Sequence, residues 1–258
     1  QLRTADPSAH KSWRTAFSEQ APEAEKRLRL MSETAKTPEQ ETPPEKSSKN
    51  PFAGIDRGFI KQQEKTRNDV YTVTDVDKKP IGKGGATVGT GVDLGRMNQH
   101  DLDNLVKNNG LSPALADKLK PYLGMTKQEA VDFVTKNRLI LSDSERDNIS
   151  EAKHLDTLKK LKSNVGELRG AVGGFDKLPD AVKTVVFDQA IHYGPDFLKS
   201  APKFKSHLKN GDTQGMIREL RNYHSPSANP PKSEIDRLER KAKLLEKALR
   251  SGKLSPRF

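Results

Sequence analysis

The chain has 258 residues, of which 32% are hydrophobic and 31% are charged, and its formal net charge is +11. It contains no cysteine, which excludes disulfides, thiol catalysis and cysteine-based zinc sites. No run of about 18 apolar residues occurs, so the sequence predicts no membrane-spanning helix. The positive charge favours polyanionic partners, which include nucleic acids, anionic membranes and bacterial cell envelopes.

Residues 1–50 are predicted to form a polar extension that ends in a linker. Residues 37–50, TPEQETPPEKSSKN, contain no Phe, Ile, Leu or Val, a composition typical of a solvated tether. The first residues, QLRTADPSAHKSWR, lack the apolar core of a signal peptide. The extension holds 9 basic and 8 acidic side chains. Nearly all of the net charge therefore belongs to residues 51–258, which are predicted to be the folded domain.

The folded domain is predicted to begin with a helix and a small sheet. Apolar residues recur at helical spacing from Phe52 to Ile60, and the pattern continues to Glu64. The β-branched segment 70–76, VYTVTDV, predicts a strand that is followed by a turn at 77–80. After a Gly-Gly break at 84–85, residues 86–92 predict a second strand. These segments would form a hairpin or a three-stranded sheet.

Beyond Gly95 the pattern is helical throughout. Capping signatures precede three of the predicted helices: Ser112-Pro113, Thr126-x-x-Glu129 and Ser142-x-x-Glu145. Residues 179–191, PDAVKTVVFDQAI, are apolar on most sides and predict the central buried helix. Residues 233–249 predict the closing helix, whose expected apolar face is Ile235, Leu238, Ala242, Leu245 and Leu249. The predicted fold class is α+β, a small antiparallel sheet plus a larger helical lobe with a cleft between them.

Two carboxylates in this arrangement suit the cleavage of a glycosidic bond. Glu64 ends the first predicted helix, and Asp93 lies near the end of the glycine-rich stretch GATVGTGVDLG. One carboxyl group would protonate the leaving oxygen and the other would deprotonate a water. A threonine hydroxyl such as that of Thr87 could hold this water, because it both donates and accepts hydrogen bonds. Asp93 as the N-cap of a following helix is the alternative interpretation.

The glycines impose a geometric condition on this hypothesis. In a straight strand Thr87 and Asp93 would lie roughly 20 Å apart, too far to share a water. Bare backbone at Gly89 and Gly91 would let the chain bend and a sugar ring approach closely. The hypothesis therefore requires a bend near these glycines. Without the bend, Asp75 or Asp77 becomes the better second carboxylate.

From Glu64 through the strand, the Gly-Gly break and ATVGTGVDLG, the sequence resembles the catalytic part of the pesticin-type muramidases of the bacteriophage-lysozyme superfamily. The resemblance continues weakly over 185–197 and 235–249. It implies a lysozyme-like fold in which Glu64 is the general acid, Asp93 the general base and Thr87 the residue that positions the water. It further implies cleavage, with inversion, of the β-1,4 bond between N-acetylmuramic acid and N-acetylglucosamine, without a cofactor.

Further residues are candidates for contact with the sugar. Gln189 lies on the predicted central helix, and His192 and Tyr193 follow at its end. For His192, a helix-end residue with a satisfied ring is the alternative interpretation. The six histidines show no metal-ligand spacing, so no metal site is expected.

Two other functions compete with the muramidase. Charge alone would also fit a basic nucleic-acid-binding protein, although aromatic residues are only 5% and no binding motif occurs. A non-catalytic wall-binding module of the same fold is the second alternative. As a muramidase, the chain is expected to be secreted or delivered into the periplasm or cell wall of a target bacterium. The expected setting is a delivered antibacterial effector, a bacteriocin or a phage-particle protein, with peptidoglycan strands as substrate and an immunity protein as a further partner.

Overall fold

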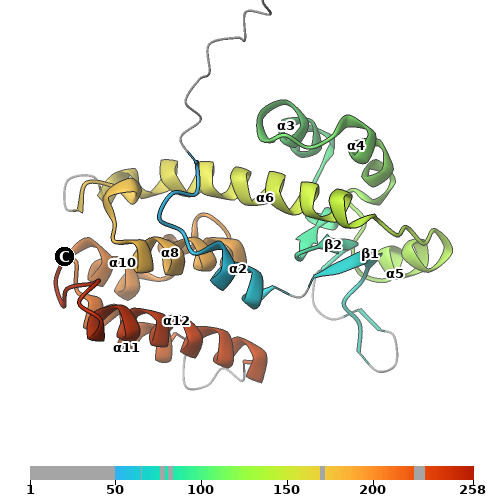
Figure 1. The fold of residues 1–258 in the computed structure, drawn as a ribbon. Helices are drawn as coiled ribbons and strands as arrows, with labels where there is room; N and C mark the ends of the chain where they lie inside the picture. The colour runs from blue at the N-terminus through green and yellow to red at the C-terminus, as the bar shows by residue number, and fades with distance from the viewer. Residues whose placement is uncertain (1–49, 65, 76–78, 81–83, 169–171, 224–229) are drawn as a thin grey trace, which may run out of the picture. The chain divides into compact units, whose positions relative to one another are not determined.

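The computed structural model describes residues 50–64, 66–75, 79–80, 84–168, 172–223 and 230–258. Residues 1–49 of the extension predicted at 1–50 and the alternative carboxylate Asp77 lie outside the described residues. Within the described part, a short helix and a three-stranded sheet come first, and the remaining elements are helical. The predicted α+β class is confirmed (Figure 1).

The first helix leads directly into the sheet. Helix α2 spans Arg57–Gln63 and begins at Asp56, whose side chain accepts a hydrogen bond from the Phe59 backbone N–H at 2.8 Å. The helix ends at Glu64, where the backbone turns to an extended conformation with φ −102° and ψ 128°. The end of α2 therefore places Glu64 between the helix and the sheet.

The sheet is antiparallel, in the order β1-β2-β3. Its strands are β1 (Arg67–Tyr71), β2 (Thr87–Gly89) and β3 (Val92–Asp93). The predicted strand at 86–92 is thus interrupted by a turn and becomes two strands. The predicted strand at 70–76 starts earlier and ends at Tyr71, because Tyr71 pairs with Thr87, the first residue of β2. The other edge of β1 contacts 139–141 through backbone hydrogen bonds.

Helices make up the rest of the described chain. The α-helices are α3 (Gln99–Asn109), α4 (Pro113–Leu119), α5 (Lys127–Lys136), α6 (Asp143–Asn164), α8 (Asp180–Tyr193), α9 (Phe197–Ser200), α10 (Pro202–Lys209), α11 (Thr213–Arg221) and α12 (Lys232–Arg250). Short 3₁₀ turns are η1 (Leu94–Arg96), η2 (Lys120–Tyr122), η3 (Val165–Leu168) and η4 (Phe175–Lys177). None of the described helices combines the length and the apolar character that crossing a bilayer requires.

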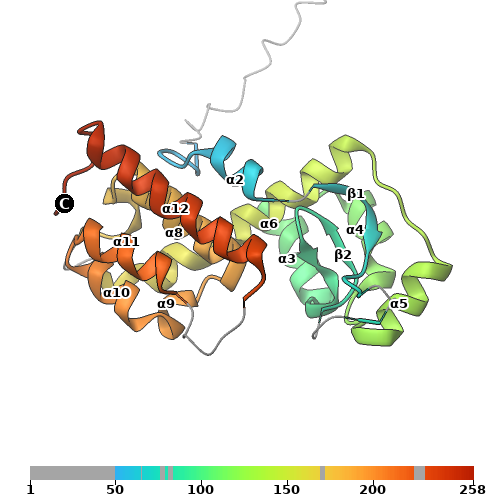
Figure 2. The ribbon, with the colours of Figure 1, turned by 90° about the horizontal axis from the view of Figure 1, so that it is seen from below.

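Two hydrophobic clusters form the core, and α6 contributes to both. Its first half buries Ile149 and Ala152 in a cluster with the sheet, α3 and α4. Its second half buries Leu158 and Leu161 in a cluster with α8, α10, α11 and α12. The predicted central helix is α8, and α12 packs against α8 and α11 (Figure 2). The prediction that Ile235 belongs to the buried apolar face of α12 is wrong, because Ile235 is exposed.

Candidate active site

The end of α2 carries a buried carboxyl group. Only 4% of the Glu64 side chain is exposed, so the solvated surface residue that is usual at a helix end is not what the structure shows. Burial raises the pKa of Glu64 above its ordinary value of 4.5, and the nearby Arg237 guanidinium opposes this rise. Arg237 Nη2 donates a hydrogen bond to Glu64 Oε1 at 3.0 Å. The environment of Glu64 therefore favours a carboxyl group that keeps its proton to a higher pH.

The glycine-rich stretch folds into the tight hairpin that the sequence hypothesis required. Thr87 and Asp93 are directly paired across β2 and β3, and paired residues have Cα atoms only about 4.5–5.5 Å apart. A turn at 90–91 joins the two strands, and Gly89 at the end of β2 and Gly91 in the turn have φ angles of 63° and 93°. Such positive φ values favour glycine, which has no Cβ to clash with its own backbone. The bend brings the threonine and the aspartate to neighbouring positions on one sheet face.

Asp93 is held by the backbone at the base of this hairpin. Its Oδ1 accepts hydrogen bonds from the N–H groups of Gly95 at 3.0 Å and Gly85 at 3.2 Å. The Oδ2 atom lies 3.2 Å from Arg96 Nε, and 23% of the side chain is exposed. Asp93 therefore does cap a following helix, η1, as the alternative interpretation held. The cap uses Oδ1, so Oδ2 is the oxygen that could accept a proton from a water.

Gly85 and Gly95 allow the backbone to close around Asp93. A Cβ atom on either glycine would collide with the Met125 carbonyl oxygen and with the other glycine. Thr87 is buried, and its hydroxyl donates to the Gly85 carbonyl at 3.2 Å. That bond uses the only hydroxyl proton, so the oxygen keeps its capacity to accept a hydrogen bond from a water.

Tyr71 is a residue of this site that the sequence analysis missed. It pairs with Thr87 across β1 and β2, so Tyr71, Thr87 and Asp93 form one row across the sheet. Burial raises the pKa of Tyr71, and the charges of Glu64 and Asp93 add to the rise. The phenol thus lies within electrostatic reach of both carboxylates. Its position seven residues after Glu64 in a strand was the available signal, but only the register shows which face it shares.

A pocket of about 250 Å³ reaches Glu64 from the side of α6. Thr66, Thr90, Ser150 and His154 line it together with Glu64, whereas neither Thr87 nor Asp93 is among its lining residues. Both ring nitrogens of His154 are buried without a hydrogen-bond partner. Burial, with the charge of Arg57, lowers the pKa of His154 to about 4, so this imidazole is neutral at neutral pH.

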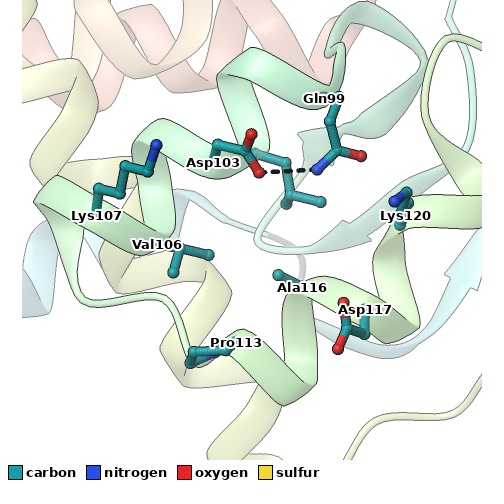
Figure 3. A pocket seen from close by; sticks show the side chains of 9 residues that line it. Gln99, Asp103, Val106, Lys107, Pro113, Ala116, Asp117 and Lys120 are labelled. Carbon is teal, nitrogen blue, oxygen red and sulfur yellow. Dashed lines mark hydrogen bonds between the residues drawn. The ribbon is translucent and has the colours of Figure 1, made fainter.

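A second pocket, of about 160 Å³, lies between α3 and α4 and includes none of the predicted site residues (Figure 3). Its polar side chains include Gln99, which donates to Asp103 Oδ1 at 2.8 Å. Among the residues that the structure describes, no group of three or more His, Asp or Glu side chains could hold a metal ion.

The three predicted sugar contacts on α8 differ in their burial and in their hydrogen-bond partners. Gln189 is completely buried and its Oε1 accepts a hydrogen bond from Lys241, so the structure places it in the core instead of facing a groove. The Tyr193 hydroxyl donates to Glu234 Oε1 at 2.7 Å. His192 packs edge-on against Tyr193 and keeps 32% of its side chain exposed. His192 is therefore the most accessible of the three.

Comparison with known proteins adds one family. The family model described as "Pesticin: Bacterial toxin homologue of phage lysozyme, C-term" matches residues 54–214, more than half of the chain. The match begins just before α2 and covers Glu64, the hairpin and α8. A search of curated proteins finds no match.

Proposed function

The chain belongs to the pesticin family of bacterial toxins homologous to phage lysozyme, and from this premise we propose that it is a peptidoglycan N-acetylmuramidase. The substrate would be the glycan strand, cut at the β-1,4 bond between N-acetylmuramic acid and N-acetylglucosamine. The observation that carries the proposal is a buried carboxyl group with a raised pKa near a hairpin that pairs a threonine with an aspartate.

Glu64 would act as the general acid. Cleavage of the bond between C1 of the muramic acid and the glycosidic oxygen leaves negative charge on that oxygen, and protonation by Glu64 neutralises it. A carboxyl group with an ordinary pKa would be ionised at neutral pH and could not donate. The burial of Glu64 supports the role because it raises this pKa.

Asp93 and Thr87 would prepare the attacking water. The Thr87 hydroxyl oxygen accepts a hydrogen bond from the water, and Asp93 Oδ2 takes its proton as the water oxygen bonds to C1. Attack from the face opposite the leaving group converts the β linkage into an α product. Gly91 has open space around its Cα, which leaves room for a sugar at the turn.

The decisive experiment compares wild-type protein with Glu64→Gln on purified peptidoglycan. We expect wild type to lower the turbidity of cell walls and the variant to lose at least ~100-fold in rate, the usual contribution of a general acid. Gln keeps an oxygen that can accept from Arg237, so thermal unfolding serves as the control for folding. A variant with full activity would refute the role of Glu64.

The products identify the bond and the mechanism. Mass spectrometry should find muramic acid at the reducing ends, whereas glucosamine there would mean a glucosaminidase. NMR of the first products should show the α anomer, and a β anomer would exclude Asp93 as a base acting on water. Binding to the walls without any loss of turbidity would support the non-catalytic wall-binding module instead.

We propose that this activity serves an antibacterial toxin delivered to the periplasm or cell wall of a target bacterium. The family description as a bacterial toxin supports the setting. In this proposal residues 1–50 connect the lytic domain to the delivery apparatus or to a longer parent chain. A producing cell would need an immunity protein that blocks the site around Glu64.

A further inference from the structure

Glu64 belongs to a buried charge cluster whose other members come from α8 and α12. Arg237 contacts Glu64 and forms two hydrogen bonds to Asp188, from Nη2 to Oδ1 at 2.7 Å and from Nε to Oδ2 at 3.1 Å. Lys241 Nζ lies 2.8 Å from Asp188 Oδ2 and donates to Gln189. Asp188, Gln189 and Lys241 are completely buried. The proposed reaction uses none of the residues behind Arg237.

The charges in this cluster conflict with the role of Glu64 unless Asp188 is present. Arg237 beside a carboxyl group favours the ionised form, which cannot donate a proton. Asp188 is ionised, because Lys241 and Arg237 hold its pKa below its usual range although burial opposes this. Its negative charge acts on Glu64 more strongly than the positive charge of Lys241 does. Asp188 therefore reduces the positive field that Glu64 experiences.

The geometry of Asp188 also fixes the direction of the Arg237 side chain. Two hydrogen bonds to one carboxylate hold a planar guanidinium in a single orientation. Arg237 then has its Nη2 group directed toward Glu64 and its Nη1 group toward the Gln63 carbonyl at 3.4 Å. Removal of the Asp188 carboxylate would remove both hydrogen bonds that hold the Arg237 guanidinium in this orientation.

We infer that Asp188 is a positioning residue of the site: it orients Arg237 against Glu64 and compensates the guanidinium charge, so that Glu64 retains its proton. The positive charge of Lys241 has the opposite effect on Glu64, and its ion pair with Asp188 holds that carboxylate in place. This inference rests on the proposed function, because it assigns Asp188 a part in keeping the general acid protonated.

Other titratable or charged groups surround Glu64 and remain unchanged in the test below. They are Tyr71 on β1, Arg57 and Lys61 on α2, and Asp147, Glu151 and His154 on α6. His192 and Glu234 contribute to the charges around Lys241 and Arg237. Burial lowers the pKa of Lys241 to about 8, so it carries its charge at neutral pH.

The test exploits the opposite signs of Asp188 and Lys241. Activity falls as pH rises through the pKa of the general acid, because the ionised form has no proton to give. Asp188→Asn leaves the guanidinium uncompensated, so we expect the alkaline limb of the kcat/KM profile to move to lower pH and kcat/KM at neutral pH to fall roughly tenfold or more. Lys241→Met removes a positive charge and should move the limb to higher pH.

A matched control separates this effect from the loss of any buried charge. Asp156 on α6 is also buried, with 4% of the residue exposed, and lies 2.9 Å from Lys160 and 3.3 Å from Lys153, outside the cluster. Asp156→Asn should leave the alkaline limb in place. If Asp188→Asn does not fold by itself, the double variant Asp188→Asn/Lys241→Met takes its place, and its alkaline limb should lie at lower pH than that of Lys241→Met. The inference would be overturned if the alkaline limbs of the kcat/KM profiles stayed in place in the folded variants, or if they moved in the same direction.

A second readout does not depend on activity. In protein labelled with ¹³C at the glutamate side-chain carboxyl carbons, the signal missing from Glu64→Gln identifies Glu64, and its titration can be followed directly. The same opposite movements are expected in Asp188→Asn and Lys241→Met. Opposite NMR shifts in a protein that cuts no peptidoglycan would support the inference and refute the proposed function, whereas an unmoved titration in an active enzyme would do the reverse.

Discussion

At the scale of single residues, Glu64 combines two demands that oppose each other. A proton donor needs a raised pKa, which burial supplies, whereas a buried carboxyl group needs a hydrogen-bond donor, which Arg237 supplies. Arg237 lowers the pKa that burial raises. Because burial is the larger effect, the pKa of Glu64 is raised overall.

The pH dependence of folding follows from the raised pKa of Glu64. The folded state binds this proton more tightly than the unfolded state, so the contribution to stability is complete at low pH and is lost as pH rises through the folded pKa. Gln at position 64 does not titrate. We therefore expect the melting temperature of Glu64→Gln, relative to wild type, to increase from pH 4 to pH 8. A difference that stays constant or decreases over this range would contradict the raised pKa.

Asp93 shows that one side chain can cap a helix and also be available for the proposed catalytic role. Oδ1 satisfies two backbone N–H groups, and this fixes the carboxylate so that Oδ2 has a defined direction. The two interpretations that the sequence left open, cap or base, therefore do not exclude each other. The condition that the sequence argument did set, a bend between Thr87 and Asp93, is met.

At the scale of elements, the β2–β3 hairpin depends on the backbone freedom of its glycines. Gly89 has φ 63°, and a Cβ atom there would lie 2.8 Å from Ser150 Oγ on α6. Gly89→Ala should therefore cost about 1–2 kcal/mol in the free energy of unfolding and lower activity by displacing Asp93. Denaturant unfolding and a turbidity assay measure the two effects.

Gly84 provides the matched control for this substitution. It lies just before β2, and a Cβ atom there would meet nothing within 4 Å. Gly84→Ala should leave both stability and activity close to wild type. If Gly89→Ala were equally harmless, the bend would not depend on glycine, and the explanation for the glycine-rich stretch would be wrong.

The predicted caps show where local sequence rules hold. At α6, Ser142 Oγ accepts from the Glu145 N–H at 3.2 Å and Glu145 Oε2 accepts from the Ser142 N–H at 2.9 Å, as predicted. At α5, Thr126 makes no such bond. Its neighbour Lys127 adopts φ 55° and donates to the Gly84 carbonyl. A contact with Gly84, 43 residues earlier in the sequence, thus overrides the local signature.

At the scale of the whole molecule, the net charge of +11 supports association with anionic wall polymers. Salt screens such contacts, because the Debye length falls from about 10 Å at 0.1 M to about 3 Å at 1 M. We expect the apparent Kd for purified sacculi to rise at least ~10-fold between about 0.05 and 0.5 M NaCl. Sedimentation of sacculi with bound protein measures it.

The control for the salt experiment is a short, uncharged chitooligosaccharide. Its binding at the site should change much less with salt, because few charges contribute over long distances. Equal salt dependence for sacculi and for the short ligand would place the effect in the site itself. If the apparent Kd for sacculi did not change with salt concentration, the basic surface would have another partner.

The sequence by itself determined the fold class, the family and the identity of the candidate residues. Helical periodicity predicted α8 and α12, and the glycine-rich stretch with its single aspartate marked the hairpin. These signals are local, because periodicity and backbone freedom are properties of short segments. The proposed roles of Glu64, Asp93 and Thr87 came from the resemblance.

Only the tertiary structure decided the burial of Glu64, the strand register that adds Tyr71 and the cluster that links Arg237 to Asp188. It also moved Gln189 from an expected sugar contact to the core. These features depend on which side chains meet between elements that are distant in sequence, such as Glu64 and Arg237, which are 173 residues apart. A pKa depends on that surrounding charge and dielectric, so no pattern within one segment could have predicted it.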